Sequence, residues 1–156
     1  MRLTAFACES VVVADQRLYA LGAGLHALST AAFPLALPAL GVGMIAYLSD
    51  AEIRVRHPFE IGLQDAVGQP CSWQSAHAAN ASEGGLVLSN ANPMTGEFAF
   101  TKDFIAVPGA DQTIVAAFNF RDVVLKEAGA YSIYAQIGNL AGEVIPLQAI
   151  LSSSGR

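Results

Sequence analysis

The sequence predicts an all-β fold, an antiparallel sandwich of two sheets of the immunoglobulin-like or jelly-roll-like kind, with little or no helix. Short apolar or alternating stretches recur along the chain, and glycine, proline, asparagine and aspartate residues separate them, as is typical of strands. We find no convincing amphipathic helical pattern over about ten or more residues. The length of 156 residues predicts a single domain, 1–156, with a long irregular excursion at about 77–96.

The first predicted element is a β-hairpin. Residues 4–13 are rich in β-branched and apolar side chains, Asp15 and Gln16 can form the turn, and residues 18–21 are the expected return strand. A helix over residues 20–29 would contain two glycines, each of which costs about 1 kcal/mol in a helix. We therefore expect strand and loop in that segment.

Both faces of the next predicted strand, residues 40–48, are apolar. Pro34 and Pro38 break the chain before it, and its two faces carry large apolar side chains on one side and two glycines, Ile45 and Tyr47 on the other. A strand that is apolar on both faces lies either under a covering layer or against another subunit. We expect the glycines to mark places where another backbone or a bulky side chain comes close.

Five further strands follow, and the C-terminal ones alternate most clearly. We expect them over residues 59–64, 71–75, 114–120, 131–137 and 144–151. Gly129-Ala130-Tyr131 begins the penultimate strand and fits the pattern of a tyrosine corner. In that arrangement the tyrosine packs its ring inward and bonds its hydroxyl to nearby backbone.

The composition excludes several classes of protein. Hydrophobic residues make up 53% of the chain and charged residues 13%, which excludes an intrinsically disordered chain. The net charge is −5 and only two residues are lysines, so there is no basic face for nucleic acid. Residues 31–48, the longest weakly polar stretch, are interrupted by prolines and glycines, and we expect a buried strand and its lead-in there instead of a membrane span.

The cysteines and the N-terminal sequence favour a cytoplasmic location. Glu9 interrupts the apolar residues near the N-terminus, so we expect no secretory signal peptide. Without such a signal, Cys8 and Cys71 are expected to be free, buried thiols.

Two parts of the chain carry recognisable apolar and turn motifs. They are Leu3–Asp15 with Leu18–Gly24, Phe33-Pro34 and Pro38-Ala39-Leu40, and later Phe118-Asn119-Phe120 with Gly129-Ala130-Tyr131. In these motifs the chain resembles a family of small bacterial proteins that is known only as a domain of unknown function. The resemblance covers most of the chain except roughly residues 77–100. It implies a shared fold, and it brings no activity and no catalytic residues.

The residues that carry chemistry show no recognised catalytic or metal-binding spacing. His26, His57 and His77 lie outside any ligand spacing, and a zinc site at Cys71 and His77 would need two more ligands. The two Gly-x-Gly pairs lack the third glycine and the following helix of a dinucleotide site. We therefore expect no metal and no cofactor. A hydrolase that pairs Cys71 with His57 or His77 is the least favoured function.

The low density of charge predicts self-association. A folded surface of roughly 7,500 Å², shared by 8 basic and 13 acidic residues, leaves one charge per about 360 Å², close to half the usual density. Because soluble monomers rarely expose a large contiguous apolar area, we expect a homo-oligomer, most simply a twofold dimer. The residues expected at the interface are Leu40, Val42, Met44, Ile45 and Tyr47.

The leading expectation for function is a non-enzymatic interaction or structural module that self-associates, with another protein or a peptide as a further partner along a sheet edge. The alternative is a small-molecule or carbohydrate-binding module that uses the loop region 77–110. The candidate binding residues are Trp73, His77, Phe98, Phe100, Arg54 and Arg56. The two arginines would share one face of a strand, where an anionic group can dock.

Overall fold

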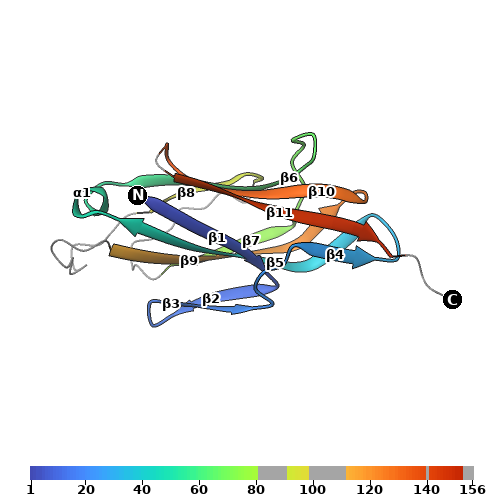
Figure 1. Cartoon of the computed structure of the whole chain (residues 1–156), viewed down its shortest axis with the longest axis horizontal. Helices are drawn as coiled ribbons and strands as arrows, with labels where there is room; N and C mark the ends of the chain where they lie inside the picture. Colours follow the sequence, from blue (N-terminus) through green and yellow to red (C-terminus); the bar gives the residue numbers. More distant parts are fainter. Residues whose placement is uncertain (81–90, 99–111, 140, 153–156) are drawn as a thin grey trace.

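Two β-sheets face each other across one apolar core, and a separate two-stranded ribbon lies on the outside of one of them (Figure 1). The structure, a computed structural model, describes residues 1–80, 91–98, 112–139 and 141–152. The four-stranded sheet has the order β1 (Arg2–Cys8), β5 (Leu35–Leu48), β9 (Gln112–Leu125) and β7 (Ser75–Asn80). The five-stranded sheet has the order β4 (Ala27–Thr30), β11 (Ala141–Leu151), β10 (Gly129–Ile137), β6 (His57–Asp65) and β8 (Met94–Phe98).

The core between the sheets comes from the predicted alternation. The inward side chains from the three central strands are buried, and they are Phe59, Ile61 and Leu63 of β6, Ile114, Ala116, Phe118 and Phe120 of β9, and Tyr131, Ile133, Ala135 and Ile137 of β10. The rings of Phe59 and Phe118 meet across the core with their centroids 5.3 Å apart. The all-β prediction and the inward faces of these strands are therefore confirmed.

The ribbon consists of β2 (Ser10–Ala14) and β3 (Arg17–Leu21), so the predicted hairpin is also confirmed. Asp15 and Gln16 both have positive φ, 49° and 59°, which is the type I′ geometry of a two-residue hairpin turn. The single strand expected over residues 4–13 is in fact two strands that separate at Glu9. After β1 has paired with β5, the chain leaves the sheet, and the ribbon packs against the outer face of β5 and β9.

The glycines of β5 make room for this covering layer. A Cβ on Gly43 would lie 2.3 Å from the ring of Phe6, and a Cβ on Gly41 would lie 2.7 Å from the sulfur of Cys8. The backbone of Ser10, at the start of the ribbon, is within 3.2 Å of the same position on Gly41. The second apolar face of β5 is thus covered largely by the chain itself.

Other predicted boundaries need correction. Pro38 lies inside β5, and it is tolerated there because β1 pairs only as far as Gly41, so β5 has a free edge on that side. One pair of strands, β4 and β11, is parallel, although only antiparallel pairing was expected. A short helix, α1 (Asp50–Ile53), joins β5 to β6. The excursion at 77–96 contains parts of β7 and β8, and residues 81–90 within it lie outside the described residues.

Candidate functional site

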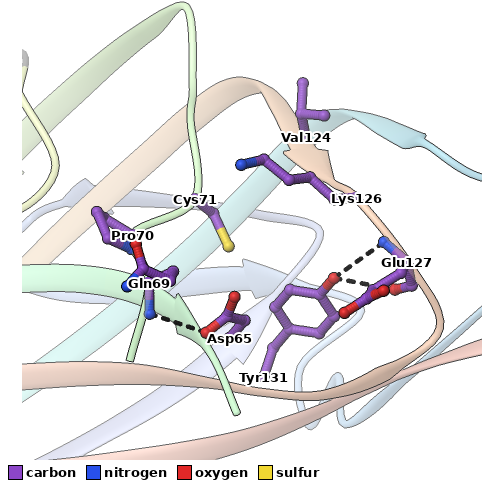
Figure 2. A pocket seen from close by; sticks show the side chains of 8 residues that line it. All are labelled: Asp65, Gln69, Pro70, Cys71, Val124, Lys126, Glu127 and Tyr131. Carbon is purple, nitrogen blue, oxygen red and sulfur yellow. Dashed lines mark hydrogen bonds between the residues drawn. The ribbon is translucent and has the colours of Figure 1, made fainter. Parts of the chain in front are cut away.

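A pocket of about 180 Å³ lies at one end of the sheets, where β6 and β9 end and β10 begins (Figure 2). The link from β6 to β7 and the turn from β9 to β10 form its walls. Its lining residues are Asp65, Gln69, Pro70, Cys71, Val124, Lys126, Glu127 and Tyr131. The pocket therefore combines one thiol, two carboxylates and one ammonium group with an apolar floor.

Asp65 shapes the first wall. Its Oδ1 accepts hydrogen bonds from the backbone N–H groups of Val67 at 3.0 Å and Gln69 at 2.8 Å, which is how an aspartate stabilises a turn after a strand. The turn brings the chain back toward β6, where the N–H of Cys71 donates to the carbonyl of Leu63 at 2.9 Å. This places the Cys71 side chain in the pocket.

Tyr131 forms the opposite wall as a tyrosine corner. Its hydroxyl donates to the carbonyl of Glu127 at 2.9 Å and accepts from the N–H of Glu127 at 3.3 Å, while its ring is buried (Figure 2). The prediction made from Gly129-Ala130-Tyr131 is confirmed. The corner fixes the turn that carries Lys126 and Glu127.

Cys71 is a protonated thiol in this pocket. Burial raises the pKa of Cys71 to about 11, the charge of Asp65 adds to the rise, and the charge of Lys126 opposes it. Figure 2 shows the sulfur pointing into the pocket between Asp65 and Lys126. A thiol with this pKa contains little thiolate at neutral pH, and the thiolate is the nucleophile.

Neither predicted histidine partner accompanies Cys71. His57 starts β6, six residues before Leu63, so an extended strand separates it from Cys71 by about 20 Å. His77 lies in the other sheet, where it pairs with Asn119 of β9. Both cysteines are free and buried, as expected.

A half-buried asparagine that the sequence analysis missed holds the pocket wall to β6. The Nδ2 of Asn92 donates to the carbonyl of Leu63 at 2.8 Å and to the carbonyl of Cys71, and its Oδ1 accepts from the N–H of Leu63 at 3.4 Å. The Asn92-Pro93 dipeptide does signal a turn. It does not signal that the side chain reaches a residue 29 positions away.

The predicted binding residues that the structure describes do not gather at one place. Trp73 packs its ring on Phe120, with centroids 4.7 Å apart, near the Asp65 end of β6. Phe98 pairs with His57 at the opposite end of that strand, and Phe100 lies outside the described residues.

The arginines are not on a strand, so the shared strand face expected for them is wrong. Arg54 is the C-cap of α1, and Arg56 lies in the link to β6, where its guanidinium is 3.3 Å from a carboxylate oxygen of Glu97. Both arginine side chains are exposed. Arg56 is thus near Phe98 and far from Trp73.

The predicted interface residues divide between the two faces of β5. Leu40, Val42 and Met44 are at most 2% exposed and pack in the core, so they are unavailable to a second copy. Ile45 and Tyr47 are half-buried on the outer face, where the guanidinium of Arg2 lies 4.1 Å from the centre of the Tyr47 ring. The exposed apolar surface must therefore be sought elsewhere.

Part of it lies on the ribbon. Asn119 of β9 fixes the inner face of the ribbon through two bonds to Val11, whose N–H donates to Oδ1 at 3.1 Å and whose carbonyl accepts from Nδ2 at 2.7 Å. On the outward face, Val12 pairs with Tyr19, and Leu21 lies two residues further along β3. These three side chains are 53%, 49% and 67% exposed. They form one continuous apolar surface, which we call the ribbon face.

The described residues contain neither a cluster of metal ligands nor a helix that could span a membrane. In residues 1–80, 91–98, 112–139 and 141–152, three or more His, Cys, Asp or Glu side chains do not gather as metal ligands would. Within the same ranges, helices are too short or too polar to cross a membrane.

Comparison with known proteins places the chain in a family. A comparison with curated proteins gives no match. The model of a family of unknown function, DUF6941, matches residues 3–150. The match includes the 77–100 segment that the resemblance in the motifs had left out. Because it spans nearly the whole length, the chain belongs to the DUF6941 family of unknown function.

Proposed function

We propose that this protein is a non-enzymatic interaction module, a β-sandwich of the immunoglobulin-like or jelly-roll-like kind that self-associates through the ribbon face. The observation that carries the proposal is the grouping of Val12, Tyr19 and Leu21 on one side of a ribbon whose other side is held down by Asn119. Single exposed apolar residues are ordinary on protein surfaces, but a contiguous group marks a contact surface.

The low charge of the whole surface supports a second copy as the partner. The accessible surface of 8737 Å² carries 8 basic and 13 acidic residues, roughly one per 400 Å², well below the usual density. A charged partner would find few complementary groups on such a surface. A copy of the same ribbon offers a matching apolar face and a twofold arrangement in which each residue meets its equivalent.

The size of the ribbon face predicts a weak dimer. Fully burying a large apolar side chain is worth about 1.5–3 kcal/mol, so three half-exposed ones contribute about 2–5 kcal/mol per copy. Association costs roughly 4–15 kcal/mol in lost freedom. Two copies together gain about 4–10 kcal/mol, so the most favourable balance is about 6 kcal/mol, which corresponds to a Kd of about 40 µM or weaker.

The non-enzymatic part of the proposal rests on the pocket chemistry. Cys71 keeps its proton at neutral pH, and its link to β6 puts it about 20 Å from His57. The two free thiols also favour the cytoplasm as the location, because disulfides form in oxidising compartments.

The experiment is light scattering on wild type and two variants at about 500 µM, roughly ten times the tightest Kd that this balance allows. We expect a concentration-dependent dimer in wild type and a monomer in the Val12→Ser, Leu21→Ser double variant. Val67→Ser is the matched control, because Val67 is 80% exposed on a turn far from the ribbon, and it should dimerise as wild type does. A monomeric wild type overturns the proposal, and a double variant that still dimerises removes the ribbon from the contact.

A further inference from the structure

The outer face of the five-stranded sheet carries a tyrosine laid over a glycine. Tyr134 of β10 pairs with Gly62 of β6. A Cβ on Gly62 would lie 2.4 Å from the Cζ and Oη atoms of Tyr134 and 2.5 Å from its Cε1. The end of the ring therefore rests on the glycine backbone, where a side chain would otherwise stand. The ring packs on the sheet at this point, and the residue as a whole is half-buried, so part of it remains accessible.

A row of hydrogen-bonding side chains runs across the sheet beside this ring. Glu60 of β6 pairs with Thr95 of β8 on one side and with Gln136 of β10 on the other, so the three residues share the outer face. The row is two residues along the strands from Tyr134, a spacing of about 7 Å. We call the ring and this row the Tyr134 platform.

The carboxylate of Glu60 in this row acts on the hydroxyl of Tyr134. Burial raises the pKa of Tyr134 to about 12, and a hydrogen bond to Glu60 and the charge of that carboxylate add to the rise. A phenol with this pKa keeps its proton at neutral pH and can both donate and accept a hydrogen bond.

A hollow of about 290 Å³ adjoins the platform. Glu60, Thr95, Gln136 and Asn139 supply its polar groups, and its other lining residues are Pro58, Phe59, Gly96 and Gly138. The Nε2 of Gln136 donates to the carbonyl of Gly138 at 2.7 Å, which orients the amide. Two amides, one carboxylate and one hydroxyl therefore line a hollow that begins two residues along β10 from the half-buried Tyr134.

The charges on this face exclude anionic ligands. Among the described residues, the lining of the hollow contains one carboxylate and no lysine or arginine. The nearest arginine named in the structure, Arg56, is paired with Glu97 at 3.3 Å. A phosphate, sulfate or uronate would meet Glu60 without a compensating cation, whereas an uncharged ligand would not.

We propose that the Tyr134 platform binds a neutral saccharide. The ring offers an apolar surface on which the C–H face of a sugar can stack, and the row and the hollow offer planar donors and acceptors for pairs of hydroxyl groups. The site lies on the five-stranded sheet, away from the ribbon on the other sheet. The proposal of saccharide binding can therefore be tested separately from the proposal of self-association.

The test is calorimetric titration of the full chain with six neutral oligosaccharides, the hexamers of cellulose, amylose, xylan, mannan, laminarin and chitin, at about 5 mM. We expect saturable binding of at least one of them and none of oligogalacturonate, the anionic control. Absence of heat with all six neutral sugars overturns the proposal. Binding of oligogalacturonate alone also overturns it.

Substitutions in the Tyr134 platform test whether the ligand binds there. Gln136→Ala and Tyr134→Leu should each weaken binding by about tenfold or more, and the leucine keeps an apolar cover over Gly62. Gln148→Ala is the control, because Gln148 is exposed on β11 and pairs with Ala130, four residues from Tyr134 along β10, and it should bind as wild type does. Near-ultraviolet circular dichroism checks that each variant is folded. Affinity that survives both Gln136→Ala and Tyr134→Leu contradicts the proposed site.

Discussion

Asn119 and Val11, 108 positions apart in the sequence, are joined by two hydrogen bonds between one side chain and one backbone unit. The amide of Asn119 acts as a strand neighbour would: it accepts from the N–H of Val11 and donates to its carbonyl. Gly41, which pairs with Asn119, leaves space for the backbone of Ser10 to approach. These contacts join the ribbon to the four-stranded sheet, and they decide which apolar side chains remain outside.

Replacing Asn119 should loosen the ribbon. In Asn119→Ala the buried N–H and carbonyl of Val11 lose both partners, which costs about 1–3 kcal/mol in free energy of unfolding. Urea denaturation measures the loss. Gln148→Ala, at an exposed position, should change stability by less than about 0.5 kcal/mol. Equal stability of Asn119→Ala and wild type would show that the ribbon does not depend on this anchor.

Gly43 and Phe6 should be energetically coupled. Gly43→Ala places a methyl group 2.3 Å from the present position of the Phe6 ring, and crowding of this kind costs about 1–3 kcal/mol. Phe6→Leu shortens the side chain and should remove much of that penalty in the double variant. A double-mutant cycle in urea measures the coupling. Purely additive effects would contradict the close contact between the two residues.

The tyrosine corner predicts that the hydroxyl oxygen of Tyr131 stabilises the fold. Tyr131→Phe removes the two hydrogen bonds to Glu127 and keeps the ring, so it should lower the free energy of unfolding by about 0.5–3 kcal/mol. Tyr19→Phe is the matched control, because Tyr19 is 49% exposed. If both variants are as stable as wild type, the corner does not hold the turn at Lys126 and Glu127.

The buried thiols predict a decline in stability at alkaline pH. The pKa of Cys71 is raised from 9.0 to about 11, so the folded chain keeps a proton that the unfolded chain loses. The stabilisation is complete below pH 9.0 and is lost as the pH rises toward about 11. Urea unfolding between these pH values should show a shallower decline for Cys71→Ala than for wild type.

Ser72→Ala serves as the control for this decline. Ser72 is exposed next to Cys71, and its replacement leaves the thiol in place. This variant should follow the wild-type curve. Identical curves for Cys71→Ala and wild type would remove Cys71 from the explanation.

The parts of the fold that could be predicted from the sequence are those with a local pattern. The alternation around Tyr131 and around Phe118 marks inward and outward residues directly, and the turn residues Asp15 and Gln16 mark the hairpin. The two apolar faces of β5 showed that something must cover Gly41 and Gly43. They did not show whether a second copy or the chain itself provides the cover, because composition does not encode the identity of a neighbour.

The candidate sites were harder to predict for a physical reason. The pocket joins Asp65 and Cys71 to the turn that follows β9, and the Tyr134 platform joins β6, β8 and β10. Both depend on strand order, which no local pattern determines. Asparagine is a residue type that is common in turns, yet the side chains of Asn92 and Asn119 each bond to the backbone of a distant strand. Spacing along the chain does not indicate such contacts.

Disulfide trapping tests the proposed contact between copies most directly. Both natural cysteines are buried, so Tyr19→Cys introduces an exposed thiol at the centre of the ribbon face, and Val67→Cys introduces one on a distant turn. Under mild oxidation, contact through the ribbon face predicts that Tyr19→Cys forms a covalent dimer of about 33 kDa, twice the 16.3 kDa chain, and that Val67→Cys stays monomeric. Equal trapping at both positions, or trapping only at residue 67, would contradict it.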